Sequence, residues 1–254
     1  MDNAWDAPVL LGANIAADGH SGYSSGAGVP VSVTVSATPI GAILVVCVAD
    51  NNSRSPGSVT DNAGNSYVLQ VSKTWNFDST PGDSGNLQIF TAICQASPST
   101  INYQTAGTNP QSYDVSAGVV CFYVQNGSPN IDLASGTIAS NITESGSGTL
   151  KSTVNFTPKT ANEFGIAVGY VAEDNNNIPY LDASSAAWTN VTIESNWIGG
   201  SYYNAIAVYW ITGVASGGSA KFELDCSAYA DFTEIAVMAY GLTAQNIRFG
   251  SIIG

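Results

Sequence analysis

The feature that most constrains this chain is a set of strand-like segments that occurs twice in the same order. Three segments of the first half resemble three segments of the second: 43–52 and 165–176, 86–92 and 204–210, 118–123 and 234–240. The copies are roughly 120 residues apart, which is longer than the repeat of a solenoid. Two copies of an apolar strand set can bury their inner faces against each other. The pattern therefore predicts an all-β fold: one antiparallel two-sheet sandwich, or jelly roll, with an internal pseudo-repeat.

Alternating side chains and turn residues divide the chain into short strands. Val29, Val31, Val33 and Val35 alternate with Ser, Thr or Pro, which is the period of a strand with one buried face. Further strands are expected at 41–49, 58–60, 66–72, 86–95, 99–104, 113–125, 150–156, 163–172, 189–195, 203–212, 219–225 and 233–241. The same pattern predicts burial of these side chains: Val31, Val33, Val35, Val46, Val48, Val120, Phe122, Val168, Val208, Ile235 and Val237.

This reading divides the chain into three parts. Residues 1–28 are expected to form a flexible arm, residues 29–242 a single sandwich domain, and residues 243–254 an apolar tail. The two halves of the domain would cover about 29–135 and 149–242. The Ser/Thr/Gly-rich stretch between them, from 136 to 148, is expected to be a crossover loop or a sheet edge.

The charge composition excludes several partners. Charged residues make up only 10% of the chain, against about 25% in ordinary soluble domains. The formal net charge is −13, with 6 Lys and Arg residues in 254. Contacts with phosphates and anionic lipids require basic residues, so we expect no binding to nucleic acid or to an anionic membrane surface. No apolar run reaches the ~18 residues of a membrane-spanning helix, so we expect no membrane insertion.

The N-terminus lacks the features of a secretory signal peptide. No Lys or Arg precedes the apolar residues Val9, Leu10 and Leu11. Together with a surface rich in Ser, Thr, Asn and Gly, this predicts synthesis without Sec export and a place in a virus particle. An extracellular or cell-surface location is the alternative.

Residues that usually carry catalysis are scarce. His20 is the only histidine, and no G-x-S-x-G nucleophile motif is present. The four cysteines lie in or beside apolar runs without metal-site spacing, so they are expected to be small buried side chains: Cys47, Cys94, Cys121 and Cys226. A glycosidase would need two acids at a set separation, and most acids here lie in turn-like segments. We therefore expect a protein that is not an enzyme.

Loops rich in acids and amides make calcium the one candidate cofactor. Asp50, Asp61 and Asp174 each begin or lie in such a segment, followed by Asn residues. Oxygen ligands on loops suit calcium. The alternative is turn chemistry, because Asp and Asn side chains bond to their own backbone in turns. Apart from calcium, no cofactor is expected.

Aromatic side chains gather at matching positions of the two halves. Trp75 and Phe77 precede the strand expected at 86, and Trp197, Tyr202 and Tyr203 precede the strand expected at 204. Exposed aromatic rings beside Asn and Asp are typical of a sugar-binding face. These residues are therefore candidates for glycan binding. The alternative is that their rings close the ends of the sandwich.

The C-terminal tail carries four large apolar side chains after the last expected strand. They are Ile247, Phe249, Ile252 and Ile253. An apolar tail in water is unfavourable unless something covers it. The tail either folds back on its own sandwich or docks on another subunit, and it is our candidate assembly element.

Five short segments form a further recognisable pattern: AWDA at 4–7, ILVV at 43–46, VTDNAGNSY at 59–67, GNLQIF at 85–90 and TANEF at 160–164. Together they resemble a β-sandwich module of tailed-phage virion proteins and large bacterial surface proteins, over roughly residues 4–242. The most distinctive segment, 59–67, is also good hairpin chemistry. The resemblance implies a structural or adhesive role without a defined active site. The apolar tail and the four cysteines depart from the usual pattern.

These observations favour a non-enzymatic structural protein of a phage-like virion. It would be a head or tail decoration, fibre or spike component whose partners are copies of itself, other virion proteins and host-surface glycans. Two alternatives belong to other classes: a subunit of an extracellular filament assembled by strand exchange, and a secreted carbohydrate-binding module. A glycan hydrolase is the least supported reading.

Overall fold

The computed structural model consists almost entirely of antiparallel strands. It describes residues 5–17, 30–50, 55–76, 84–106, 116–125, 131–145, 148–161, 163–173, 179–198, 202–228 and 233–244. The first eight strands are β1 (Val9–Ala17), β2 (Pro30–Thr34), β3 (Ile43–Asp50), β4 (Ser58–Asp61), β5 (Val68–Asn76), β6 (Ser84–Ile93), β7 (Thr100–Gln104) and β8 (Ser116–Val124). The next eight are β9 (Ile131–Ser145), β10 (Gly148–Phe156), β11 (Phe164–Glu173), β12 (Tyr180–Leu181), β13 (Thr189–Ile198), β14 (Tyr202–Ile211), β15 (Ala220–Ala228) and β16 (Thr233–Ala244). One short 3-10 helix, η1 (Ala183–Ser185), follows β12.

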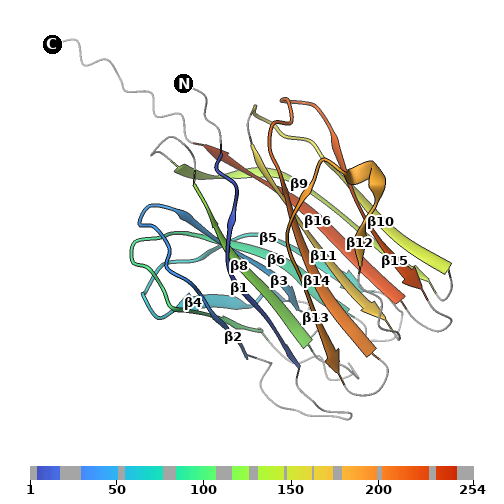
Figure 1. Cartoon of the computed structure of the whole chain (residues 1–254), viewed down its shortest axis with the longest axis horizontal. Helices are drawn as coiled ribbons and strands as arrows, with labels where there is room; N and C mark the ends of the chain where they lie inside the picture. The colour runs from blue at the N-terminus through green and yellow to red at the C-terminus, as the bar shows by residue number, and fades with distance from the viewer. Residues whose placement is uncertain are drawn as a thin grey trace.

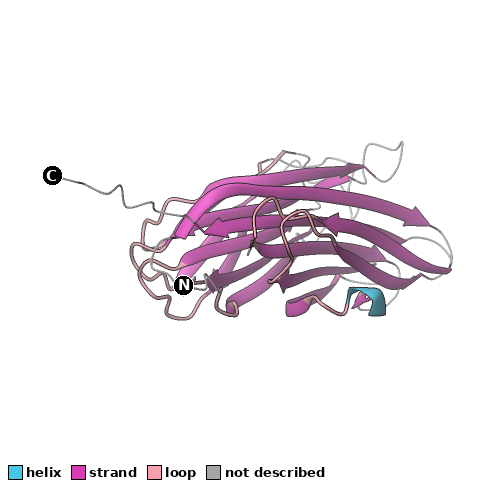
Figure 2. Ribbon diagram, turned by 90° about the horizontal axis from the view of Figure 1, so that it is seen from above, coloured by secondary structure: helices cyan, strands magenta, loops and turns pink. Residues whose placement is uncertain are grey.

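The described strands form four sheets rather than the expected two. The first half contributes a five-stranded sheet, β1-β8-β3-β6-β5, and a three-stranded sheet, β2-β7-β4. The second half contributes β13-β14-β11-β16-β9 and β10-β15-β12. One hydrophobic cluster joins the two five-stranded sheets, and each three-stranded sheet shares its own cluster with the five-stranded sheet of its half. The all-β antiparallel sandwich is confirmed, with the sheets stacked in layers (Figures 1 and 2).

Continuous apolar runs become the strands that are covered on both faces. All eight residues of β3 are buried. Its side chains alternate between the cluster shared by the two halves, which receives Val45 and Cys47, and the cluster of the first half, which receives Leu44 and Val46. Because each face of this strand meets another sheet, both faces must be apolar, and no polar alternation remains. By contrast, β2 has one buried face and alternates in the expected way.

Both halves have the same strand order. If β1 is matched with β9, β2 with β10 and so on to β8 with β16, the strand orders of the two sheets in the first half become those of the two sheets in the second half. In each half most strands adjacent in the sheets are not consecutive in the chain, as in a jelly roll; β5–β6 and β13–β14 are the consecutive pairs. Sequence similarity pairs Cys47 with Val168 or Gly169, Ile89 with Ala207 and Tyr123 with Tyr240, and the structure moves the last two matches by one position. Cys47 and Ile89 face the core between the halves, as do Val168 and Val208, whereas Ala207 faces the second half's own core.

Tyr123 and Tyr240 show the same one-residue difference. Tyr240 lies in the core between the halves, but Tyr123 packs against the core of the first half. Since side chains alternate along a strand, a slip of one residue moves them to the opposite face. Sequence similarity therefore pointed to strands at the same place in the order of each half. Which residues correspond depends on which hydrophobic cluster each side chain faces.

Two segments differ from their expected structure. Residues 9–17, expected in a flexible arm, form strand β1, which pairs with β8. Small residues such as Gly12 allow close approach there, because a Cβ at Gly12 would lie 2.4 Å from the carbonyl oxygen of Thr34. The stretch from 136 to 148 belongs largely to the long strand β9, which is the edge of its sheet, so the expectation of an edge holds and that of a loop does not.

The predicted core is confirmed. All the side chains predicted to be buried are buried: Val31, Val33, Val35, Val46, Val48, Val120, Phe122, Val168, Val208, Ile235 and Val237. The four cysteines are also buried and form no disulfide, and burial raises the pKa of the Cys121 thiol well above its usual value. Among the described residues, no helix has the length and hydrophobicity needed to span a membrane.

Candidate functional site

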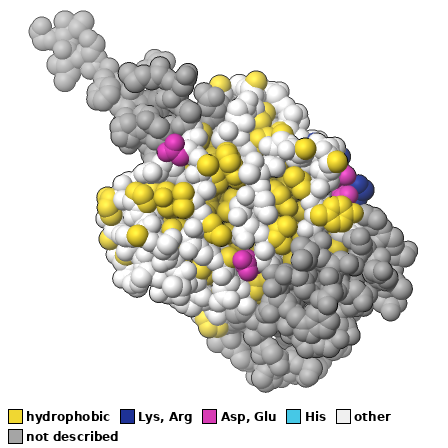
Figure 3. Space-filling view, viewed as in Figure 1, with side chains coloured by type: hydrophobic (Ala, Val, Ile, Leu, Met, Phe, Trp, Pro, Cys, Tyr) yellow, Lys and Arg dark blue, Asp and Glu magenta, His cyan; other side chains and the backbone are white. Residues whose placement is uncertain are grey.

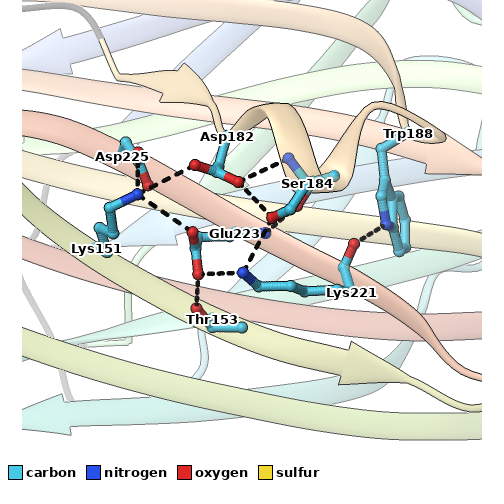
Figure 4. Close-up of polar contacts among 9 residues, drawn as sticks. Lys151, Thr153, Asp182, Ser184, Trp188, Lys221, Glu223 and Asp225 are labelled. Carbon is cyan, nitrogen blue, oxygen red and sulfur yellow. Dashed lines mark hydrogen bonds and ion pairs between the residues drawn. The ribbon is translucent and has the colours of Figure 1, made fainter.

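The most concentrated group of charged side chains in the described residues lies on the outer face of the β10-β15-β12 sheet (Figure 4). The Nζ atom of Lys151 on β10 lies 2.8 Å from Asp225, 3.1 Å from Asp182 and 3.4 Å from Glu223. Lys221 forms a further ion pair with Glu223 at 2.7 Å. We call these five residues the carboxylate cluster. The three acids offer oxygens that all lie within 4.8 Å of one another.

Strand pairing and the η1 helix position the cluster. Lys151 and Asp225 are direct partners across the β10–β15 ladder, and Glu223 lies two residues from Asp225 on the same face. Asp182 caps η1 by accepting from the Ser184 amide at 2.7 Å, and the Ser184 hydroxyl also donates to it. Lys221 donates to the Ser184 hydroxyl at 3.0 Å. The cluster therefore fastens the connection around η1 onto β15.

Neutral contacts reinforce this attachment. The Ser185 hydroxyl accepts from the Glu223 amide at 2.8 Å, and the Trp188 indole N–H donates to the Lys221 carbonyl at 2.9 Å. Trp188 itself packs edge-on against Phe156 and Phe222 in the core of the second half. The carboxylate cluster and the apolar core of the second half thus lie on opposite faces of β15.

The pKa directions follow from these contacts. The bonds that Ser184 and Lys151 donate hold the pKa of Asp182 well below its usual value. Burial raises the pKa of Glu223, but bonds from Lys221, Thr153 and Lys151 outweigh it, so that pKa is also lowered. For Asp225, burial dominates over the attraction of Lys151, and its pKa is raised. The bond to Asp225, above all, raises the pKa of Lys151.

We expect the cluster to contribute acid-sensitive stability. Asp182 and Glu223 have lowered folded-state pKa values, so their contribution is present above the ordinary carboxyl pKa and is lost as pH falls through the folded-state values. Asp225 acts in the opposite direction because its pKa is raised. Replacing Lys151 with Met should lower the melting temperature at pH 7, since three neighbouring carboxylates lose their shared cation.

The measurement is thermal unfolding of Lys151→Met and the wild type between pH 3 and pH 7. The difference in melting temperature should begin to narrow below about pH 4, where carboxylates of the unfolded chain become protonated, and part of it should remain at pH 3 because the folded-state pKa of Asp182 is well below its usual value. Lys73→Met, at an exposed position of β5, is the matched control for loss of one lysine. An equal difference at every pH would contradict an electrostatic role for Lys151.

The carboxylate cluster holds its own cation. The ammonium group of Lys151 occupies the position between the three carboxylates that a metal ion would need. Beside the cluster lies an open hollow of about 420 Å³ whose lining includes Ser184, Ile211, Thr212 and Lys221. Two of these lining residues, Ser184 and Lys221, are hydrogen-bonded to each other at 3.0 Å, and the Ser184 hydroxyl also donates to Asp182 of the cluster.

Of the acids predicted to bind calcium, the two that the structure describes, Asp61 and Asp50, accept hydrogen bonds from different parts of the protein. Asp61 accepts from the amides of Ala63 and Asn65 at 2.9 and 3.1 Å, from the Asn65 side chain at 2.7 Å and from the Tyr67 hydroxyl at 2.9 Å. Gly64 has a φ of 81°, which this turn requires. The Asn65 side chain also accepts from the Gln95 amide at 2.8 Å. The distinctive segment 59–67 is therefore a structural turn.

The sequence predicted Asp50 to lie in a loop. In the structure it is the fully buried last residue of β3. Its carboxylate accepts from the Tyr103 hydroxyl at 2.5 Å, which in turn accepts from Gln88 at 2.9 Å. Asp174 lies outside the described residues. The hydrogen bonds of Asp50 and Asp61 explain these acids through turn and core structure, so the calcium expectation is not supported at these two positions.

We expect Asp61→Ala to cost about 1–3 kcal/mol of unfolding free energy, because several donors lose their acceptor. Burial raises the Asp61 pKa, but the bonds from Asn65, Tyr67 and the backbone outweigh it, so the pKa is lowered. The Asp61 contribution should therefore be present above the ordinary carboxyl pKa and fall at lower pH. Urea unfolding at pH 7 with and without calcium tests this. A calcium-dependent difference between variant and wild type would restore the calcium hypothesis.

Trp75 was predicted to be an exposed glycan-binding residue, and this was wrong. It lies on β5, is 1% exposed, and stacks on Tyr170 of the second half with ring centroids 4.9 Å apart. A large apolar ring is most stable where another sheet covers it, and here the second half does so. This agrees with the alternative that aromatic rings close the sandwich.

The other aromatic candidates remain predictions. Trp197 lies on β13 opposite Tyr203 of β14, and the neighbouring pair is Ile198 and Tyr202, but the orientations of these side chains are not described. Phe77 lies outside the described residues. The same holds for the four apolar residues of the tail: Ile247, Phe249, Ile252 and Ile253.

Sequence reasoning did not find the carboxylate cluster, although a partial signal exists. In 221–225 the charged residues Lys221, Glu223 and Asp225 alternate with Phe222 and Leu224, which indicates a strand with one charged face. Nothing local indicates that Lys151 and Asp182 meet this face. The ladder and the η1 connection bring them there.

The fold and site define an all-β protein in which each half has the strand order of a jelly roll. The lysines and acids of its carboxylate cluster pair with one another. Comparison of the chain with family models, curated proteins and solved structures finds no match.

Proposed function

We propose that this chain is a non-enzymatic structural component of a virion, serving in a head or tail decoration, fibre or spike. The observation that carries the proposal is the joining of two jelly-roll halves through a large shared apolar core. Such a body is rigid and offers outer surfaces for assembly, which suits a building unit. Jelly rolls recur in viral capsid and lectin domains, although fold analogy alone does not determine function.

The chemistry of the described polar groups supports a structural role. The charges of the carboxylate cluster pair with one another, Asp61 holds a turn, and Asp50 is bonded inside the core. Charged side chains are sparse on the face shown in Figure 3, where uncharged polar and hydrophobic atoms predominate. Such a surface suits stable contacts in an assembled particle.

The direct test is the physical location of the protein. Cells that produce it should yield particles on a density gradient in which nuclease-protected nucleic acid and this chain sediment together, as measured by mass spectrometry. Recovery only in soluble fractions without particles would contradict the proposal. Release of sugar products from polysaccharides by the purified protein would instead favour an enzyme.

Glycan contact is a second candidate function, supported by the register of one hairpin. Trp197 and Tyr203 are opposite each other across β13 and β14, and Tyr202 is the next residue. This places three aromatic residues at one end of the hairpin. Trp197→Ala should weaken binding to a glycan array without changing the melting temperature. Equal binding by variant and wild type would remove this candidate.

A further inference from the structure

One corner of the first half exposes large apolar side chains without a described cover. Val68, at the start of β5, is 53% exposed, and Ile40, in the turn before β3, is 66% exposed. Ile93, at the end of β6, is partly buried against the core between the halves. The turn carrying Ile40 is bonded to the next residue, Cys94, through Gly41 and Ala42. We call Ile40, Val68 and Ile93 the β5 corner.

Val68 lies on the side of its sheet that faces the second half. Its ladder partner is Thr91, which lies between Ile89 and Ile93 on the β6 face directed to the shared core. Gln70 confirms the direction, since it donates to Thr91 at 2.7 Å and accepts from Tyr240 of β16 at 3.1 Å. The β5 corner is therefore the open margin of the core between the halves.

Strand β16 ends beside this corner. Gln70 of β5 contacts Tyr240 of β16. Going from Gln70 to Val68 on β5 follows the same direction in space as going from Tyr240 to Ala244 on β16. Leu242, within this last part of β16, pairs with the start of β11. β5 is also the last strand of its sheet, so its outer edge has no ladder partner among the described strands. An apolar, unpaired edge is where an added strand binds most readily.

We infer that the β5 corner of one copy receives residues 245–254 of a second copy. This rests on the proposed structural role and names its partner. The segment has the composition of an added strand, with Ile247 and Phe249 alternating around Arg248. Fully extended, its ten residues span up to ~33–36 Å, which is enough to reach a neighbouring molecule.

Two features favour a second copy over the segment's own chain. β16 points away past the corner, so docking on the same chain requires a reversal directly after Ala244. Of the two residues available, only Asn246 favours a turn, and the Asn-Gly or Gly-Gly pair typical of a tight reversal is absent, because the first glycine is Gly250. The segment also carries Arg248 and no acidic residue, so it approaches a neighbour of net charge −13 with favourable electrostatics.

Cysteine cross-linking between two separately tagged chains tests the inference. One chain carries Val68→Cys and the other Ile247→Cys; the four native cysteines are buried, so they should not compete. Mild oxidation of the mixture should give a disulfide-linked dimer containing both tags. Lys73→Cys, at an exposed position farther along β5, is the matched control and should give little product with Ile247→Cys.

If oxidation of the mixture yields only monomers, with no disulfide between the two chains, the inference is overturned. This holds even if a single chain that carries both substitutions forms an internal disulfide. Full-length protein should also form larger species in light scattering, and a chain ending at Ala244 should remain folded but monomeric. The particle experiment gives a separate answer. Particles that contain the chain, together with absent cross-linking, would leave the structural role intact and reject only this contact.

Discussion

Replacing Trp75 with Ala is expected to cost about 3–5 kcal/mol of unfolding free energy, the range for removal of a large buried aromatic side chain. Trp75 is almost fully buried and stacks on Tyr170, so the change leaves a cavity between the two halves. Its indole also lies over Gly85, where a Cβ would come within 2.2 Å of the ring. The surrounding backbone is therefore shaped to this ring and cannot readily collapse onto a smaller residue.

Urea unfolding followed by circular dichroism measures this effect. Trp75→Phe, which keeps an aromatic ring facing Tyr170, should lose less stability than Trp75→Ala. Glycan binding per folded molecule should not change in either variant. A Trp75→Ala protein that keeps full stability but loses glycan binding would show that the ring is exposed and functional, contrary to the structure.

Phe156→Ala is expected to have a similarly large effect, about 3–5 kcal/mol. Phe156 is fully buried in the core of the second half and meets Trp188 at 5.9 Å between ring centroids. Its ring also fills the space beside Gly165 and Gly241. Phe156→Leu, which preserves most of the volume, should cost less than about 1.5 kcal/mol.

This variant also tests whether the halves unfold together. The cluster between the five-stranded sheets contains residues of both halves, so loss of one half would expose apolar surface of the other. A single calorimetric transition should therefore shift as a whole in Phe156→Ala. Two transitions, of which only one shifts, would show that the halves unfold independently.

The local pattern was sufficient to predict the strands and most of the core. The apolar run in β3 indicated a strand, and the alternation around Val31 and Val33 indicated one buried face, whereas only the structure showed that both faces of β3 are covered. β1 was missed because its small residues and the Gly/Ser-rich sequence after it resemble an arm. β9 was read as a loop or an edge because Ser, Thr and Gly have weak strand signals.

By itself, the sequence determined the all-β class, most of the strands and many of the side chains that avoid water. Only the tertiary structure decided which sheet covers each face: Trp75 is buried because the second half supplies Tyr170, and Cys47 matches Val168 because both face the shared core. It alone also brought Lys151 to acids on β15 and beside η1. The physical reason is that periodicity records the contrast between apolar and polar faces, whereas contact partners depend on ladders between distant strands.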